Sequence, residues 1–209
     1  MAHTDGRVWY ASYGSNANWD RFRTYLEGGA APGAGAGQRG ARDPSPPEAD
    51  LAVSLPFTVY FARSSRRWGG AVAFADHHRH EHHVGLARAW LVTVEQFEDI
   101  AAQESGREAM RCDLDALRRD GHLRCGDGWY DHLLHVGDHD GMPIVTFTAT
   151  EPLAEQPTGA PSAPYLRHVG AGLADAHGLD DDELGRYLLG CPGVTDGWDE
   201  ATLAALWHS

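Results

Sequence analysis

Residues 8–22 read VWYASYGSNANWDRF, and this stretch changes from one pattern to another at its centre. Its first half is rich in β-branched and aromatic residues, which predicts a buried strand. Gly14, Ser15 and Asn16 follow at once, and a helical pattern then begins over about 17–27. We therefore expect a strand that runs into a helix with no spacer, and Ser15 and Asn16 are both favoured capping residues.

A strand-to-helix junction of this kind can bind an anion. The first N–H groups of a helix have no intrahelical partner, and the helix dipole adds positive potential there. A carboxylate or a developing oxyanion is stabilised at such a place. Gly14 lets a ligand approach the backbone and tolerates a positive φ. The same residues also suit a simple helix cap, so the junction by itself leaves both interpretations open.

The segment LVTVEQFEDIAAQESGR, residues 91–107, predicts a helix with a carboxyl group on its buried side. Thr93 with Gln96 forms a capping box, which starts the helix at the next residue. The apolar stripe that follows at helical spacing consists of Phe97, Ile100 and Ala101. Glu104 is the next position of that stripe.

Burial raises the proton affinity of a carboxyl group, and the negative end of a helix dipole acts in the same direction. Both effects favour a general acid or base that works near neutral pH. The alternative is a frayed last turn, in which Glu104 reaches water or pairs with Arg107 or Arg111. The other acidic residues of the helix fall away from the stripe and are expected in solvent: Glu95, Glu98 and Asp99.

The remaining patterns predict one mixed α+β domain over residues 1–209, with a curved or closed sheet. We expect strands over 7–13, 57–64, 70–76, 86–93, 128–136 and 143–150. We expect helices over about 17–27, 94–104, 109–119, 164–176, 180–189 and 197–207. A Gly- and Pro-rich loop occupies 28–50, and a helical C-terminal extension begins at about 164.

Composition limits the classes of partner. The chain has 209 residues, 42% of them hydrophobic, which is enough for one packed core. A net charge of −13 disfavours nucleic acid and anionic membranes and favours small molecules. No signal peptide is visible, and no apolar run approaches the ~20 residues of a membrane span. We expect a cytoplasmic protein, whose oligomeric state the sequence leaves undetermined.

A metal site is the main alternative that the sequence offers. The run DHHRHEHHVG, residues 76–85, contains five histidines, which are good ligands for zinc or nickel: His77, His78, His80, His82 and His83. Its position between two strands favours an exposed hairpin instead. The Gly-rich run 33–40 has no preceding strand and no phosphate-binding lysine. We therefore expect neither a metal nor a cofactor.

Four short motifs together resemble the γ-glutamylcyclotransferase family. They are Tyr13-Gly14-Ser15-Asn16, the pair Gln103-Glu104, WGGAVAF at 68–74 and PSAPY at 161–165, and they occur in the family's order. In that family the glutamate of the Gln-Glu pair is catalytic, and the Pro-Ser-x-x-Tyr segment carries a tyrosine on the substrate side. The resemblance implies a small mixed β-barrel with peripheral helices.

Two departures from the family pattern concern the substrate pocket. Members often place a tyrosine a few residues after the glutamate, whereas here residues 107–127 intervene and Trp129-Tyr130 is the nearest equivalent. The loop over 28–50 is also longer than in compact members. Both differences suggest a modified pocket, and they slightly favour a specialised amine substrate over glutathione-like peptides.

The resemblance implies intramolecular aminolysis, in which the α-amino group of a γ-glutamyl unit attacks its own γ-carbonyl and releases 5-oxoproline and an amine. Glu104 would be the general acid and base, with no metal. The substrate-side residues that it implies are Tyr13, Gly14, Ser15, Asn16, Gly70, Tyr130 and Tyr165. The alternatives are an acyltransferase or amide hydrolase on the same scaffold, a non-catalytic small-molecule binding protein, and a metal protein that uses the histidine run.

Overall fold

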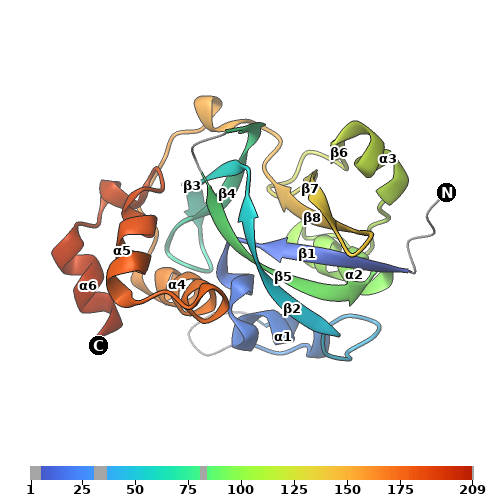
Figure 1. Cartoon of the computed structure of the whole chain (residues 1–209), viewed down its shortest axis with the longest axis horizontal. Coiled ribbons are helices and arrows are strands. Elements are labelled where there is room, and N and C mark those ends of the chain that lie inside the picture. Colours follow the sequence, from blue (N-terminus) through green and yellow to red (C-terminus); the bar gives the residue numbers. More distant parts are fainter. Residues whose placement is uncertain (1–5, 31–36, 81–83, 209) are drawn as a thin grey trace.

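A six-stranded mixed sheet forms the centre of the molecule, and a two-stranded hairpin packs beside it (Figure 1). The structure is a computed structural model that describes residues 6–30, 37–80 and 84–208. The strands are β1 (Arg7–Ser12), β2 (Ala49–Leu55), β3 (Phe57–Ser65), β4 (Gly70–Arg79), β5 (Gly85–Thr93), β6 (His122–Arg124), β7 (His132–His139) and β8 (Met142–Thr148). The sheet has the order β2-β5-β1-β8-β7-β6, with β1 parallel to β8 and the other pairs antiparallel, while β3 and β4 form the hairpin.

Helices cover both faces of the sheet. They are α1 (Trp19–Glu27), α2 (Val94–Glu104), α3 (Leu114–Asp120), α4 (Ala163–His177), α5 (Asp181–Leu189) and α6 (Glu200–Trp207). The first three pack on one face of the sheet. The hairpin and the three C-terminal helices, drawn in orange and red in Figure 1, pack on the other.

Strand β1 contributes to both cores, because successive side chains of a strand point to opposite faces. Val8 and Tyr10 belong to the core under α1 and α2, and Trp9 and Ala11 belong to the core under the hairpin. All four are 4% exposed or less. The strand that precedes the Gly-Ser-Asn junction is therefore fixed from both sides.

The α+β class and all six expected strands are confirmed, with ends that shift by up to four residues. The helices at 94–104 and in the C-terminal third are also confirmed, whereas α3 begins five residues later than expected. Two strands, β2 and the three-residue β6, were not expected. The start of β2 falls within the predicted loop 28–50, whose Gly and Pro content gave no strand pattern.

The expected barrel closure is not confirmed. Between β4 and β8, the side chain of Thr148 takes the place of a backbone ladder. Its Oγ1 accepts a hydrogen bond from Ala75 N at 3.0 Å and donates one to Ala75 O at 2.6 Å. The hairpin consequently remains a separate sheet in the part of the chain that the structure describes.

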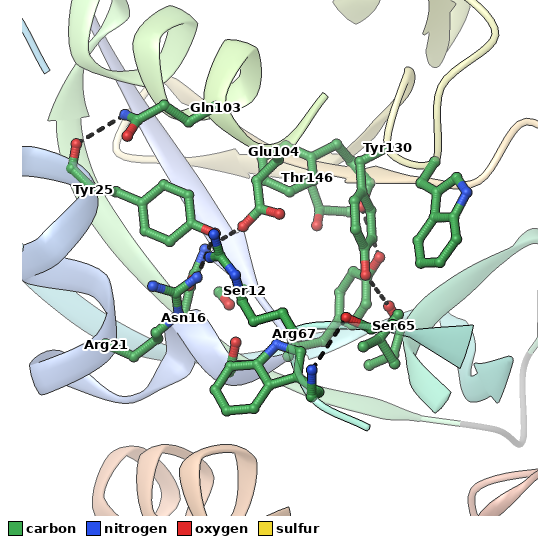
Figure 2. A pocket seen from close by; sticks show the side chains of 18 of the residues that line it. Ser12, Asn16, Arg21, Tyr25, Ser65, Arg67, Gln103, Glu104, Tyr130 and Thr146 are labelled. Carbon is green, nitrogen blue, oxygen red and sulfur yellow. Dashed lines mark hydrogen bonds between the residues drawn. The ribbon is translucent and has the colours of Figure 1, made fainter. Parts of the chain in front are cut away.

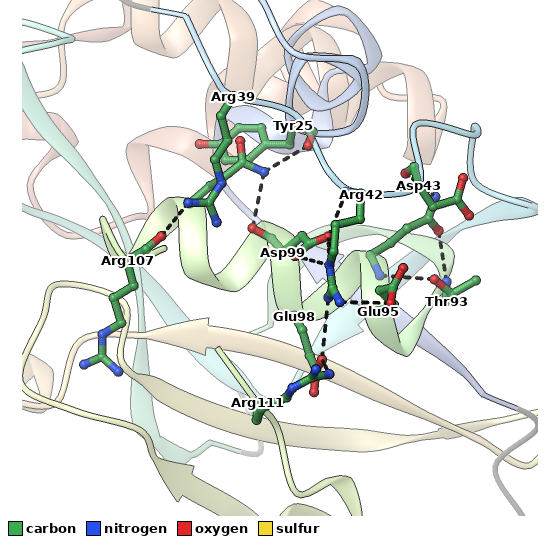
Figure 3. Close-up of polar contacts among 12 residues, drawn as sticks. Tyr25, Arg39, Arg42, Asp43, Thr93, Glu95, Glu98, Asp99, Arg107 and Arg111 are labelled. Atoms are coloured by element: carbon green, nitrogen blue, oxygen red, sulfur yellow. Dashed lines mark hydrogen bonds and ion pairs between the residues drawn. The ribbon is translucent and has the colours of Figure 1, made fainter. Parts of the chain in front are cut away.

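The second half of the Gly- and Pro-rich loop is tied to α2 (Figure 3). Arg42 donates to Asp99 from its backbone N–H at 2.9 Å and from its guanidinium at 3.0 Å. Arg111 pairs with Glu98 at 2.7 Å. The expectation that Glu98 and Asp99 are solvated is therefore wrong: they are 5% and 8% exposed because these arginines cover them.

Some sequence-based expectations lie outside the described residues. They concern residues 1–5 at the N-terminus, 31–36 of the Gly-rich loop, and His82 and His83 of the histidine run. Within the described ranges, no helix is long and apolar enough to cross a membrane.

Helix α4 packs directly on the turn that follows β1. Gly172 of this helix faces the backbone of Ala17 and Asn18, and a Cβ atom at this position would overlap both residues. The helix can approach the turn this closely only because residue 172 has no side chain.

We expect Gly172→Ala to lower the free energy of unfolding by about 1–3 kcal/mol, since the added methyl group must displace the backbone of the turn. Gly185→Ala in α5 is the matched control, because a Cβ there meets nothing within 4 Å. This control should stabilise the protein by about 0.4–1 kcal/mol. Denaturant midpoints measure both effects, and equal midpoints for the two variants would contradict the packing described for Gly172.

Candidate active site

A cavity of about 250 Å³ lies where the turn after β1 meets the C-terminal end of α2 (Figure 2). Of the eight site residues that the sequence indicated, seven line this cavity: Tyr13, Gly14, Ser15, Asn16, Glu104, Tyr130 and Tyr165. The structure thus brings together residues from four separate parts of the chain. Their roles toward a substrate stay predictions.

Gly70 is the eighth residue, and it does not line this cavity. A Cβ atom at this position would lie 2.8 Å from Ser162 N and 3.0 Å from Ala160 O. The glycine therefore allows the start of β4 to pack against the segment before α4. The structure places Gly70 outside the cavity lining, and the substrate-side role expected of it stays a prediction.

Gly14 opens a separate 3₁₀ turn over Ser15–Ala17, which is not the first turn of α1. Asn18 caps α1 by accepting a hydrogen bond from Arg21 N at 3.1 Å. The interpretation of Ser15 or Asn16 as the cap of this helix, one of the two that the sequence left open, is therefore wrong. Because another residue does the capping, the Asn16 side chain is available to the cavity.

A glycine is needed at position 14 because the Tyr165 hydroxyl lies close to its backbone, and not because the backbone has a positive φ. Its φ is −107°, which any residue can adopt. A Cβ atom here would lie only 3.0 Å from the Tyr165 hydroxyl oxygen. That oxygen accepts a hydrogen bond from Ala73 N at 3.1 Å, and Ser15 N–H also bonds to it. The turn, β4 and α4 thus meet at one phenol oxygen.

Glu104 is the last residue of α2, and its half-buried carboxylate is bound by Asn16 (Figure 2). Asn16 Nδ2 donates to Glu104 Oε1 at 2.8 Å and lies 3.3 Å from the Tyr10 hydroxyl. Because an ionised carboxylate only accepts hydrogen bonds, this contact fixes which way the Asn16 amide points. Asn16 is 3% exposed, and its Oδ1 is a buried acceptor without a partner among the described residues.

The alternative pairings of Glu104 are not found. Arg107 pairs with Asp131 at 2.5 Å, and Arg111 pairs with Glu98. Within the described part of the chain, Glu104 makes no ion pair. Its carboxylate faces the cavity with a neutral amide, rather than a cation, as its partner.

The preceding residue of the motif, Gln103, has a structural role. It donates to Tyr25 O at 3.0 Å and accepts from Gly40 N at 3.3 Å. These bonds tie the end of α2 to α1 and to the loop. Both residues of the Gln-Glu pair line the cavity, and Gln103 also anchors the end of the helix.

The inserted segment 107–127 helps to place Tyr130. The carboxylate of Asp131 is fully buried, and its ion pair with Arg107 fastens the loop before β7 to the residues just after α2. Tyr130 extends from this loop into the cavity and donates from its hydroxyl to Ala73 O at 3.1 Å. A tyrosine thus reaches the cavity despite the insertion.

The sequence did not indicate four polar residues that line one side of the cavity: Arg21, Tyr25, Gln38 and Arg67. Arg21 is 1% exposed and donates from Nη2 to the Tyr25 hydroxyl at 2.9 Å. The spacing of Arg21 and Tyr25, four residues apart, puts them on one helix face. That spacing was the available signal, but nothing local shows that the face is buried.

The histidine run is only partly exposed. His77 and His78 belong to β4, and the His77 ring stacks on His132 at 4.4 Å and bonds through Nε2 to Ala149 O at 2.6 Å. Burial and the neighbouring His77 lower the pKa of His132 to about 4. Among residues 6–30, 37–80 and 84–208, no group of three metal-binding side chains is close enough to hold an ion.

Comparison with solved structures agrees with the motif resemblance. A structure described as a γ-glutamyl cyclotransferase superposes with a TM-score of 0.52 and 15% identity over 97% of this chain and 99% of that one. A human protein described as uncharacterized gives a TM-score of 0.50 and 16% identity, with the same coverage of both chains. The fold of this chain is therefore γ-glutamylcyclotransferase-like. At these identities the likeness concerns the fold alone, and no family model matches the chain.

A curated relative is histone deacetylase 5 of Arabidopsis thaliana, which is 31% identical over 201 residues. The match covers 87% of this chain but 30% of the plant protein. The chain thus spans less than a third of that relative, whose name describes the whole plant protein.

Burial determines the protonation of the tyrosines around the cavity. It raises the pKa of five of them above the ordinary value: Tyr10, Tyr13, Tyr25, Tyr130 and Tyr165. For Tyr25, the negative charge of Glu104 and a hydrogen bond between the two groups raise the pKa further. These phenols are neutral at physiological pH and can both donate and accept hydrogen bonds.

The same shift extends to all seven tyrosines of the chain, since burial also raises the pKa of Tyr60 and Tyr187. A folded-state pKa above the unfolded value gives stability that is complete below pH about 10 and is lost as the pH rises further. We expect tyrosinate absorbance to appear only together with the loss of far-UV circular dichroism, in one transition. Tyrosinate absorbance at pH about 10 with an intact dichroism spectrum would contradict this expectation.

Proposed function

We propose that the chain is an enzyme of the γ-glutamylcyclotransferase type, which releases 5-oxoproline and a free amine from a γ-glutamyl amine or peptide. The observation that carries this proposal is the Glu104 carboxylate, held at 2.8 Å by Asn16 of the turn and directed into a cavity. The fold likeness supports it. We further propose a cytoplasmic location, a small-molecule substrate and no requirement for a metal.

The reaction requires few protein groups because the attacking α-amino group and the γ-carbonyl belong to the same substrate molecule. The α-amino nitrogen attacks the γ-carbonyl carbon, a C–N bond forms to close the five-membered ring, and the original amide C–N bond breaks. Glu104 takes the proton from the attacking nitrogen and returns it to the leaving nitrogen. The carboxylate is thereby regenerated, and no co-reactant is consumed.

The turn after β1 supplies backbone donors for the oxyanion or for the α-carboxylate. The N–H of Ala17 is taken by Gly14 O at 3.0 Å, and that of Ser15 bonds to Tyr165. The candidates for substrate binding are therefore the N–H groups of Gly14 and Asn16. These N–H groups would stabilise the oxyanion or the α-carboxylate effectively, because the turn fixes their orientation before the substrate binds.

Tyr130 and Tyr165 form a rigid wall of the cavity along β4. Their hydroxyl groups bind the two backbone groups of one residue, Ala73 O at 3.1 Å and Ala73 N at 3.1 Å. Both rings are held in place before a substrate arrives, which favours a role in positioning the glutamyl unit. Acyl transfer, amide hydrolysis and binding without turnover are the alternatives, and only cyclisation yields 5-oxoproline.

We expect Glu104→Gln to lower the rate of 5-oxoproline release by about 10²–10⁴-fold, because the amide keeps an acceptor for Asn16 but cannot take a proton. Mass spectrometry on a panel of γ-glutamyl amines and peptides measures the product. Glu108→Gln is the control, since this exposed carboxyl group does not line the cavity. Wild-type rates in Glu104→Gln would falsify the assignment.

We expect Asn16→Asp to move the acidic limb of the pH profile of kcat/KM to higher pH. Two carboxyl groups this close share one proton, so the active form of the pair requires a more alkaline solution. Asn18→Asp is the control, because aspartate caps a helix as well as asparagine does. A purely structural role of Asn16 would lower the rate at every pH and leave the shape of the profile unchanged.

A further inference from the structure

Two of the three cysteines of the chain flank α3 and β6 in the inserted segment 107–127. Cys112 comes just before α3, and Cys125 comes just after β6. Both are half-buried free thiols that pack against the core under α1 and α2, whereas Cys191 is buried in the other core. The proposed reaction uses none of the three.

The fold brings Cys112 and Cys125 to the same end of this segment. Helix α3 ends at Gly121, whose left-handed backbone (φ 80°) lets the chain turn back into β6. Helix and strand then lie side by side (Figure 1). The seven residues of α3 and the three residues of β6 each rise about 10 Å, so the chain leaves β6 near the place where it entered α3.

The two thiols are close enough to affect each other. Burial raises the pKa of the Cys112 thiol to about 12, and the charge of Cys125 is the next largest cause. The effect of Cys125 exceeds that of Glu98, although Glu98 Oε1 lies only 3.1 Å from Cys112 N. Because the interaction between two charges weakens with distance, the sulfur atoms of Cys112 and Cys125 lie close together.

The backbone of Cys125 is held by the same residues that place Tyr130. Cys125 N donates to Asp131 O at 2.7 Å, and Cys125 O accepts from Arg107 Nη1 at 2.9 Å. These two partners also form the ion pair that fastens the loop before β7. Cys112 N donates to a glutamate of α2. A covalent bond between the two sulfur atoms would therefore join the loop that carries Tyr130 to a residue fixed on α2.

We propose that Cys112 and Cys125 form a reversible disulfide that restrains the loop carrying Tyr130. The pair is then an oxidisable dithiol, and its co-reactant is a small-molecule disulfide. This inference goes beyond the proposed reaction and does not depend on it. In a reducing compartment, such a bond forms under oxidising conditions and is removed afterwards.

The chemical step is thiol–disulfide exchange. One protein thiolate attacks a sulfur atom of the small disulfide, which gives a mixed disulfide and displaces one small thiolate. The second protein thiolate attacks the protein sulfur of the mixed disulfide and displaces the other small thiolate. In all, the protein loses two protons and two electrons, and the small disulfide takes them up to become two thiols.

Burial makes this exchange slow at neutral pH. It raises the pKa of both thiols, so little of the attacking thiolate is present. The disulfide, in contrast, carries no charge and suits the apolar core on which both residues pack. The exchange should accelerate about tenfold for each pH unit between pH about 7 and 9, since the thiolate is the attacking form.

The test uses bis(2-hydroxyethyl) disulfide, which contains no γ-glutamyl unit. The wild type, Cys112→Ser, Cys125→Ser and the control Cys191→Ser are each incubated with it at pH about 8.5. Intact mass distinguishes an internal disulfide, which loses two hydrogen atoms, from a mixed disulfide, which gains a hydroxyethylthio group. Peptide mapping identifies the bonded cysteines, and thermal melts check the folding of each variant.

We expect an internal disulfide between Cys112 and Cys125 in the wild type and in Cys191→Ser, and none in the other two variants. The oxidised wild type should melt about 5–10 °C higher than the reduced wild type, because the bond closes the loop between the two cysteines. A wild type that gives only mixed disulfides overturns the proposal. A bond that involves Cys191 or a second chain also overturns it.

Amide hydrogen exchange tests the restraint of the loop. In the oxidised wild type, the amides of residues 126–131 should exchange at least about threefold more slowly than in the reduced wild type. Cys112→Ser treated in the same way should show no change. A disulfide that forms without slower exchange at 126–131 overturns the role assigned to it. Neither measurement uses a γ-glutamyl substrate, so both outcomes are independent of the 5-oxoproline assay.

Discussion

The hydrogen bond between Asn16 and Glu104 joins residues 88 positions apart, and it depends on the match between one strand and one helix. Strand β1 pairs with β5 so that Arg7 lies opposite Thr93, which is the residue that caps α2. The helix therefore starts beside the first residue of β1. It reverses the direction of β5 and runs alongside β1 toward the turn that follows this strand. Eleven helical residues rise about 16 Å, and six strand residues rise about 20 Å, so the last residue of α2 arrives beside the turn after β1. One residue more or less in α2 would rotate the position of the Glu104 carboxylate by about 100° around the helix axis.

Local signals predicted α2 correctly, because the capping box and the apolar stripe lie within the segment itself. Its acidic residues were misplaced, since Asp99 is covered by Arg42, which lies 57 residues away in the chain. The turn was misread for a similar reason. Asn16 and Asn18 are equally good caps locally, and contacts with distant residues decide that Asn18 caps the helix while Asn16 binds Glu104.

The short family motifs predicted residues that gather around one cavity, but not what each of these residues contacts. Gly14 and Gly70 both occur in such motifs, and in each case the glycine serves a close approach between backbone segments or to a phenol. The arginines of the cavity belong to no motif that resembled the family. Their recognition required the fold, because only the packed structure shows that α1 turns Arg21 inward and that the β3–β4 turn adds a second guanidinium.

The two tyrosines on Ala73 have a consequence for how the molecule meets copies of itself. They occupy both backbone groups that Ala73 would otherwise offer to a neighbouring strand, and Thr148 does the same at Ala75. Exposed strand edges recruit strands from other molecules, and proteins commonly protect such edges. Here the wall of the cavity provides that protection. The cavity thus lies where β4 meets β8 without a backbone ladder, and the side chains at this place bind backbone groups of β4 that no strand of the described chain pairs.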